Sequence, residues 1–232
     1  MFTRLLSPSA WPGQCLICHA WPARTLCPAC VGRFAQPVPR CHGCALPVPE
    51  GVARCGACLR EPPPFEQCRV AVSYQWPWAR CVARLKFQQD PGLASALAAL
   101  LADAPGVAPA LATADMVLPL PLSSQRLAER GYNPAQLLAQ RLDGHRLRLQ
   151  VLLRIRHGTP QRGLTRAERL RNVRGAFALD PLLAPSVRGR HVVLVDDVMT
   201  TGASLAEAAR VLRAGGAAQV TALAFARTDV PH

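Results

Sequence analysis

The sequence has little lysine, few aromatic residues and no long apolar run. Of its 27 basic residues only Lys86 is a lysine, and aromatic residues make up 5% of the 232 positions. The longest mostly apolar stretch, Leu93 to Ala102, is half the length of the ~20 residues that a membrane-spanning helix needs. The first residues carry one arginine and two prolines that interrupt their apolar side chains, so we expect neither a signal peptide nor a transmembrane segment. We therefore expect a cytoplasmic protein.

Cysteine is absent from the last 150 residues and concentrated at the start. Eight of the ten cysteines lie before residue 60, in four Cys-x-x-Cys pairs. Structural disulfides are rare in the cytosol, where such pairs more often bind metal. The pairs are Cys15/Cys18, Cys27/Cys30, Cys41/Cys44 and Cys55/Cys58.

Two such pairs complete the tetrahedral four-thiolate shell of a structural zinc ion. Three pairings are possible, and we favour the sequential one, because the link from Pro37 to Arg40 separates two similar units joined by hairpin-sized loops. Redox-active cysteines or disulfides are the alternative. Cys68 and Cys81 have no partner at metal spacing and are expected to be buried thiols. The sequence thus predicts two Zn²⁺ sites in a double zinc-ribbon domain over residues 1–64, followed by an α/β domain over residues 65–232.

The net charge of +13 is carried largely by arginine. From Arg141 to Arg174 there are ten arginines against two acidic residues, Asp143 and Glu168. Such a segment faces either an anion or open solvent. The charge alone predicts salt-sensitive binding to polyanions without sequence preference.

The clearest functional pattern begins at an apolar run, Val192 to Val195, which predicts a strand buried on both faces in a parallel sheet. Asp196 and Asp197 then follow at its carboxyl end, where open α/β sheets bind ligands. The segment from Val198 to Gly202 is expected to be a loop. Ser204 to Glu207 forms a capping-box sequence that predicts the start of a helix. That helix has apolar residues at core spacing, ends at Gly215-Gly216, and precedes a strand over Gln219 to Ala226.

This arrangement suits a phosphorylated sugar. Backbone N–H groups at a helix N-terminus bind phosphate, and hydroxyl side chains add donors. Two adjacent carboxylates can accept hydrogen bonds from neighbouring ribose hydroxyls. An acidic turn before an ordinary helix is the plainer alternative. The candidate phosphate and ribose residues after the acidic pair are Val198, Met199, Thr200, Thr201, Gly202, Ala203 and Ser204.

The stretch VVLVDDVMTTGAS is similar to the phosphoribosyl pyrophosphate signature of type I phosphoribosyltransferases. The wider chain resembles the ComF family of competence proteins, which includes GntX-like proteins of Gram-negative bacteria. The resemblance includes the cysteine pairs, RLKFQQD at 84–90, and the segments 117–139 and 152–177. It implies a mainly parallel sheet flanked by helices. It also implies that Asp196 and Asp197 act as the catalytic pair.

The same resemblance implies further ligand contacts. Arg126 and Arg130, expected in a loop between a strand over Met116 to Leu120 and a helix capped by Asn133, would hold pyrophosphate. For Arg126 a solvated surface is the alternative. Lys86, expected before the first full helix of the domain, either reaches the ligand or lies on the surface. The hood expected over the segment 154–174 would contribute Arg154, Thr159, Gln161, Arg169 and Asn172.

Three functions are compatible with this pattern. One is a Mg²⁺-dependent transferase that passes a ribosyl phosphate to an acceptor, although no residues indicate which base. A second, implied by the ComF resemblance, is the handling of single-stranded DNA during uptake, with a competence helicase or other uptake proteins as partners. The third is a sensor of phosphoribosyl pyrophosphate without turnover. Tyr74, Trp76 and Trp78 could stack on bases, whereas the alternation of the two tryptophans is also typical of core packing.

Overall fold

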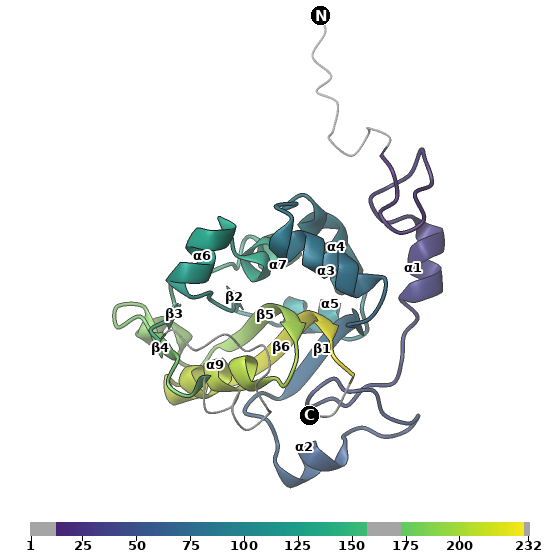
Figure 1. Cartoon of the computed structure of the whole chain (residues 1–232). Coiled ribbons are helices and arrows are strands. Elements are labelled where there is room, and N and C mark those ends of the chain that lie inside the picture. Colours follow the sequence, from purple (N-terminus) through teal and green to yellow (C-terminus); the bar gives the residue numbers. More distant parts are fainter. Residues whose placement is uncertain (1–12, 157–172, 230–232) are drawn as a thin grey trace, which may run out of the picture. The chain divides into compact units, whose positions relative to one another are not determined.

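The computed structural model describes residues 13–156 and 173–229 (Figure 1). Contacts within the chain divide it into two compact units, Met1–Gln36 and Pro37–His232. Residues 37–64, and with them the second set of cysteine pairs, therefore belong by their contacts to the larger unit. The functional boundary after residue 64 stays a prediction. Over the described ranges, every helix is too short or too polar to cross a bilayer.

The smaller unit is organised around its cysteines. Its one described helix, α1 (Pro28–Phe34), begins after Cys27, whose sulfur accepts the N–H of Cys30 at 3.4 Å. Gly13 and Ala23 form an isolated antiparallel bridge. The buried cysteines Cys15, Cys27 and Cys30 form the core, against which Ile17, Ala23 and Phe34 pack.

The larger unit is built on a four-stranded parallel sheet with the order β1-β6-β5-β2. Its strands are β1 (Gln67–Ser73), β2 (Met116–Pro119), β5 (His191–Met199) and β6 (Gln219–Arg227). The predicted strands at 116–120, 192–195 and 219–226 are confirmed within one to four residues at their ends. Val192 to Val195 are completely buried, as expected for a strand covered on both faces.

Helices cover both faces of this sheet (Figure 1). The helices α3 (Trp78–Phe87), α4 (Leu93–Ala102) and α7 (Pro134–Asp143) lie on one face, and α9 (Ala203–Ala214) lies on the other. The antiparallel pair of β3 (Leu152–Arg154) and β4 (Phe177–Leu179) packs beside α9. The remaining short helices are α2 (Gly56–Arg60), α5 (Val107–Ala112), α6 (Ser124–Arg130) and η2 (Ala184–Val187). The predicted α/β class with a parallel sheet between helices is confirmed.

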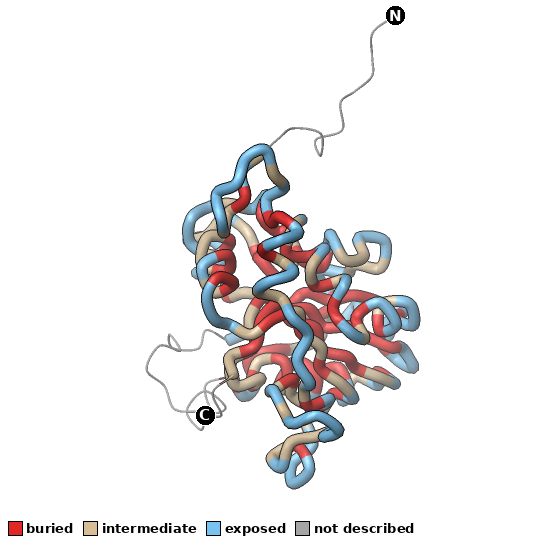
Figure 2. The backbone as a smooth tube through the Cα atoms, turned by 90° about the vertical axis from the view of Figure 1, so that its right-hand side faces the viewer, coloured by how far each residue is buried: buried red, intermediate tan, exposed pale blue. Residues whose placement is uncertain are grey.

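Buried residues follow the strands and the inner faces of the helices (Figure 2). On the α9 side, the predicted helix-core residues Leu205, Ala208 and Leu212 pack with Leu194 of the sheet. On the opposite side, Trp78 meets Phe225 edge to face, with ring centroids 6.2 Å apart. Trp78 is therefore a core residue. The two predicted thiols, Cys68 and Cys81, are buried as expected.

Two local predictions about α9 are wrong. The helix begins at Ala203, after Gly202 in the left-handed conformation at φ 78°, so Ser204 does not cap it. Glu207 does not complete a capping box, because its buried carboxylate accepts the N–H of Gly175 at 2.7 Å. The expected loop is also shorter, since β5 continues to Met199.

Of two predictions for the segment after β2, one is wrong and one is confirmed. Arg126 and Arg130 do not lie in a loop. They lie on α6, which Ser123 caps by accepting the N–H of Arg126 at 3.3 Å and which Gly131 ends at φ 80°. The predicted cap of α7 is confirmed, because the Asn133 side chain accepts the N–H of Ala135.

Candidate functional site

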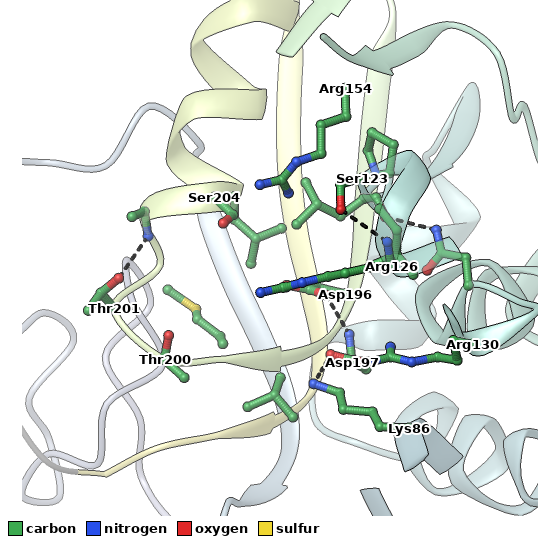
Figure 3. Close-up of a pocket in the computed structure, with 18 of the residues that line it drawn as sticks. Lys86, Ser123, Arg126, Arg130, Arg154, Asp196, Asp197, Thr200, Thr201 and Ser204 are labelled. Atoms are coloured by element: carbon green, nitrogen blue, oxygen red, sulfur yellow. Dashed lines mark hydrogen bonds and ion pairs between the residues drawn. The ribbon is translucent and has the colours of Figure 1, made fainter. Parts of the chain in front are cut away.

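A pocket of about 670 Å³ lies at the carboxyl ends of β5 and β2 (Figure 3). It is formed where the β5–α9 turn, the β2–α6 turn, the end of α3 and strand β3 meet. Thirteen of the predicted site residues come together here. They are Lys86, Arg126, Arg130, Arg154, Asp196, Asp197, Val198, Met199, Thr200, Thr201, Gly202, Ala203 and Ser204.

The acidic pair lies in the last half of β5. Asp197 is 7% exposed, and the Nζ of Lys86 lies 2.7 Å from its Oδ1. The pKa of Asp196 is raised to about 7. Burial is the largest cause and the negative charge of Asp197 adds to it, whereas the positive charge of Lys86 lowers the pKa. A carboxylate pair of this kind, balanced by one ammonium group, can accept hydrogen bonds from two adjacent hydroxyls. Lys86 lies in the last turn of α3, so its expected place before the first full helix was wrong. It nevertheless lines the pocket together with the acidic pair.

The turn from Thr200 to Ser204, named here the phosphate loop, leads into α9. The first backbone N–H groups of a helix have no intrahelical partners and carry the positive end of the helix dipole. Thr201 contributes its hydroxyl, which accepts the N–H of Ala203 at 3.3 Å. A Cβ at Gly202 would lie 2.4 Å from the Cε of Met199, so the end of that side chain would have to shift, and the φ of 78° at Gly202 itself favours glycine. The loop therefore has the properties of an anion site.

Four cationic side chains face this pocket, against three carboxylates from Asp196, Asp197 and Glu129. Figure 3 shows that Arg126 and Arg154 extend toward the space above Asp196. Burial lowers the pKa of Arg154, and the charge of Arg126 lowers it further. Repulsion between these positive charges raises the free energy of the empty pocket, and a bound polyanion offsets that repulsion.

The pocket also contains two aromatic residues, of which the sequence indicated Tyr74 as a stacking candidate but gave no indication of Phe87. Phe87, 64% exposed, lies under the guanidinium of Arg130 at 5.3 Å. Tyr74, at the end of β1, lines the same pocket. Ser123 and Gly131 could have been recognised as the two ends of a short helix. Nothing in the local sequence of Phe87 indicates a binding role, because the fold alone brings it to the pocket, whereas Tyr74 was a stacking candidate and does line the pocket. Trp76, considered for stacking, is exposed but does not line the pocket.

Four predicted hood residues lie outside the described residues. They are Thr159, Gln161, Arg169 and Asn172. Arg154, on β3, is the hood candidate that the structure places in the pocket.

The cysteines form two separate groups of four. In each, the sulfur atoms lie within 4.8 Å of one another, and no cysteine is in a disulfide. Cys18 and Cys27 have their sulfurs 3.7 Å apart, and Cys44 and Cys55 have theirs 3.6 Å apart. A tetrahedral zinc ion with bonds of ~2.3 Å places its sulfurs about 3.8 Å apart. The sequential pairing is therefore confirmed: Cys15, Cys18, Cys27 and Cys30 form the first four-cysteine site, and Cys41, Cys44, Cys55 and Cys58 form the second.

Comparison with known proteins agrees with this geometry. A family model described as "Phosphoribosyl transferase domain" matches residues 127–230, which include the acidic pair and the phosphate loop. The "DNA utilization protein YhgH" of Salmonella typhimurium is 35% identical over 94% of this chain and 98% of that protein.

Two relatives carry competence names. The "Competence protein F" of Haemophilus influenzae is 32% identical over 87% of this chain and 90% of its own length. The "Competence protein ComFC" of Bacillus subtilis is 36% identical over 49% of this chain and 45% of that protein. Similarity of this extent, together with the phosphoribosyl transferase domain match and the paired four-cysteine groups, shows that the chain belongs to the ComF family.

Proposed function

We propose that this protein binds phosphoribosyl pyrophosphate with Mg²⁺ in the pocket and uses that site while handling single-stranded DNA. One observation carries the first part: an acidic pair, a helix N-terminus and a group of cations line one pocket. Each of these features matches a different part of the ligand.

The phosphate loop at the start of α9 holds the 5-phosphate in this proposal. Asp196 and Asp197 accept hydrogen bonds from the ribose hydroxyls, and Arg126, Arg130 and Arg154 neutralise the pyrophosphate. Carboxylate and phosphate oxygens are the ligands that Mg²⁺ prefers, so the ion enters with the ligand beside the acidic pair. Stabilising the pyrophosphate as it leaves would also support transfer of the ribosyl phosphate to an acceptor.

Zinc fills both four-cysteine sites in this proposal. The sulfur positions fit tetrahedral coordination, and the chain offers four thiols to each ion. Zinc there has a structural role, because all four ligands come from the protein and no position stays open for a substrate.

The DNA role is supported by the names of the relatives and by the charge of +13. Exposed Phe87 and Tyr74 at the pocket add flat surfaces on which unpaired bases can stack. We place the protein in the cytoplasm, where a competence helicase or other DNA-uptake proteins would be its partners.

Thermal unfolding with and without ligand tests the ligand assignment. A ligand at about 100 times its Kd stabilises the folded state by ~2.7 kcal/mol, which raises Tm by several degrees. We expect this shift with Mg²⁺ and phosphoribosyl pyrophosphate and a smaller one with Mg²⁺ and ATP, which lacks the pyrophosphate on the ribose C1. Equal shifts would show general polyanion binding and contradict the assignment.

Turnover and DNA binding are separate measurements. Release of pyrophosphate in the presence of candidate bases or single-stranded DNA would support the transferase alternative. Fluorescence anisotropy with a labelled single strand should show binding that weakens steeply with salt. DNA binding without pyrophosphate release favours the uptake role over a metabolic transferase. Ligand binding with neither turnover nor DNA binding favours a sensor.

A further inference from the structure

Arg227 is a buried arginine outside the ligand pocket. It lies at the end of β6 and is 4% exposed. Its Nε donates to the carbonyl oxygen of Cys44 at 3.0 Å, and its Nη1 donates to the carbonyl oxygens of Met199, at 3.3 Å, and Thr200. One guanidinium thus joins the backbone of the second four-cysteine site to the first residue of the phosphate loop.

Packing reinforces the same junction. The thiol of Cys68 donates to the sulfur of Met199 at 3.4 Å, and the Cys68 N–H donates to the carbonyl of His42 at 2.8 Å. Met199 in turn fills the space that the missing side chain of Gly202 leaves. Ala45, which follows Cys44, is completely buried in the same hydrophobic cluster as Met199. The phosphate loop therefore rests on the segment that carries the second site.

Charge favours the same link. Arg227 carries a positive charge that is almost completely buried, two residues before the acidic residue Asp229. Asp229 pairs with Arg40, at 3.5 Å. A zinc ion with four thiolates carries a net charge of about −2. A metal-loaded second site thus supplies negative charge beside a buried guanidinium whose described hydrogen bonds go to neutral oxygens.

The first four-cysteine site is built differently. Its buried sulfurs pack against Ile17, Ala23 and Phe34, all within the smaller compact unit. The chain therefore contains two sites with the same four thiol ligands. Arg227 joins the second site to the phosphate loop, so the first site serves as a control for the second.

We propose that Arg227 is a positioning residue through which metal loading of the second four-cysteine site, but not of the first, sets the affinity of the phosphate loop for its ligand. Losing the second metal frees the Cys44 carbonyl to move, and the loop loses the support that holds its backbone N–H groups in place. This inference rests on the proposed binding of phosphoribosyl pyrophosphate.

Matched cysteine variants of the full chain test the proposal. Cys44→Ser and Cys18→Ser each remove one thiol ligand and keep the backbone, and zinc analysis should show that each loses one ion. Calorimetry with Mg²⁺ and phosphoribosyl pyrophosphate should give about tenfold weaker binding for Cys44→Ser, within the usual range of coupling between sites. Cys18→Ser should stay within twofold of wild type. Equal affinities in the two variants would overturn the proposal.

A second readout needs no ligand. Amide hydrogen exchange over residues 199–205 should be faster in Cys44→Ser than in wild type and unchanged in Cys18→Ser. If wild type fails to bind phosphoribosyl pyrophosphate, the proposed function fails, and exchange alone decides whether the link exists. Unchanged exchange in Cys44→Ser contradicts it.

Arg227→Lys tests the same link without removing a cysteine, so the result does not depend on Cys44→Ser remaining folded. Lysine keeps the charge but lacks the planar fork that reaches several carbonyls at once. The variant should keep both zinc ions and its far-ultraviolet circular dichroism, yet show faster exchange at 199–205 and about tenfold weaker ligand binding. A variant that retains zinc, exchange and affinity at wild-type values refutes the role of Arg227.

Discussion

The ammonium group of Lys86 lies 2.7 Å from the carboxylate of Asp197, so α3 contributes a positive charge beside the acidic pair of β5. Asp197 is nearly buried, and its neighbour Asp196 has a raised pKa. The lysine lowers the cost of holding two carboxylates side by side. It also supplies a cation next to the expected phosphate oxygens.

Lys86→Met should weaken binding of Mg²⁺ and phosphoribosyl pyrophosphate at pH 7 by about tenfold, because charge-assisted contacts of this kind contribute ~1.5–3 kcal/mol. The pKa of Asp196 should rise further without the ammonium group. Arg84→Met is a matched control, since Arg84 lies on the same helix and pairs with Asp90 at 3.0 Å, and neither residue lines the pocket. Similar affinities for the two variants, measured by calorimetry, would count against a ligand role for Lys86.

Asp196 should make stability depend on pH. Burial, and then Asp197, raises its pKa to about 7, so the folded state holds a proton that the unfolded chain releases at lower pH. The resulting stabilisation is present at low pH and is lost as the pH rises through about 7. Asp196→Asn cannot ionise, so its Tm relative to wild type should be higher at pH 8 than at pH 5, by about 3 °C. A difference that is the same at both pH values would contradict the raised pKa.

Gly202 should not tolerate alanine. Its φ is 78°, and an added Cβ would meet the Cε of Met199 at 2.4 Å, which forces the phosphate loop or Met199 to move. Gly131 has φ 80° but has open space around an added Cβ, so Gly131→Ala imposes the same backbone strain without the clash. We expect at least tenfold weaker ligand binding in Gly202→Ala than in Gly131→Ala. Equal losses would mean that backbone strain, and not the packing on Met199, decides the effect.

Purified protein should contain two zinc ions per chain, measured by elemental analysis after purification without chelators. Cys58→Ser should retain one, because the first four-cysteine site has all its ligands in a separate compact unit. Disulfides or redox-active pairs in place of zinc would give no metal in either protein.

Much of the candidate site follows from short-range patterns. The apolar run before Asp196 predicts a buried strand, and the loop and helix after it follow in one continuous segment. The spacing of the cysteines also predicts the two four-cysteine groups correctly, because each Cys-x-x-Cys pair lies within one local turn of the chain. Asn133, followed by Pro134, is a strong local cap and is found as expected.

The errors and omissions come from two causes. Short elements such as α6 have too few residues for a periodic pattern, so the sequence predicts a loop at Arg126 although Ser123 and Gly131 mark both ends of a helix. Other features depend on distant segments. Arg227 and Cys44 are 183 residues apart, and no sequence pattern joins them. The same holds for Phe87, which reaches the pocket from α3, whereas Tyr74 was already singled out in the sequence as a residue that could stack on bases.

Calorimetric titration of Mg²⁺ and phosphoribosyl pyrophosphate into wild type and the double variant Asp196→Asn/Asp197→Asn tests the central claim most directly. Both substitutions keep the size of the side chains and remove the negative charges that are expected to accept the ribose hydroxyls. Wild type should bind one ligand per chain, and the double variant should bind at least tenfold more weakly, since each lost charged hydrogen bond contributes ~1.5–3 kcal/mol. Equal binding by the two proteins would contradict the assignment of this pocket to phosphoribosyl pyrophosphate.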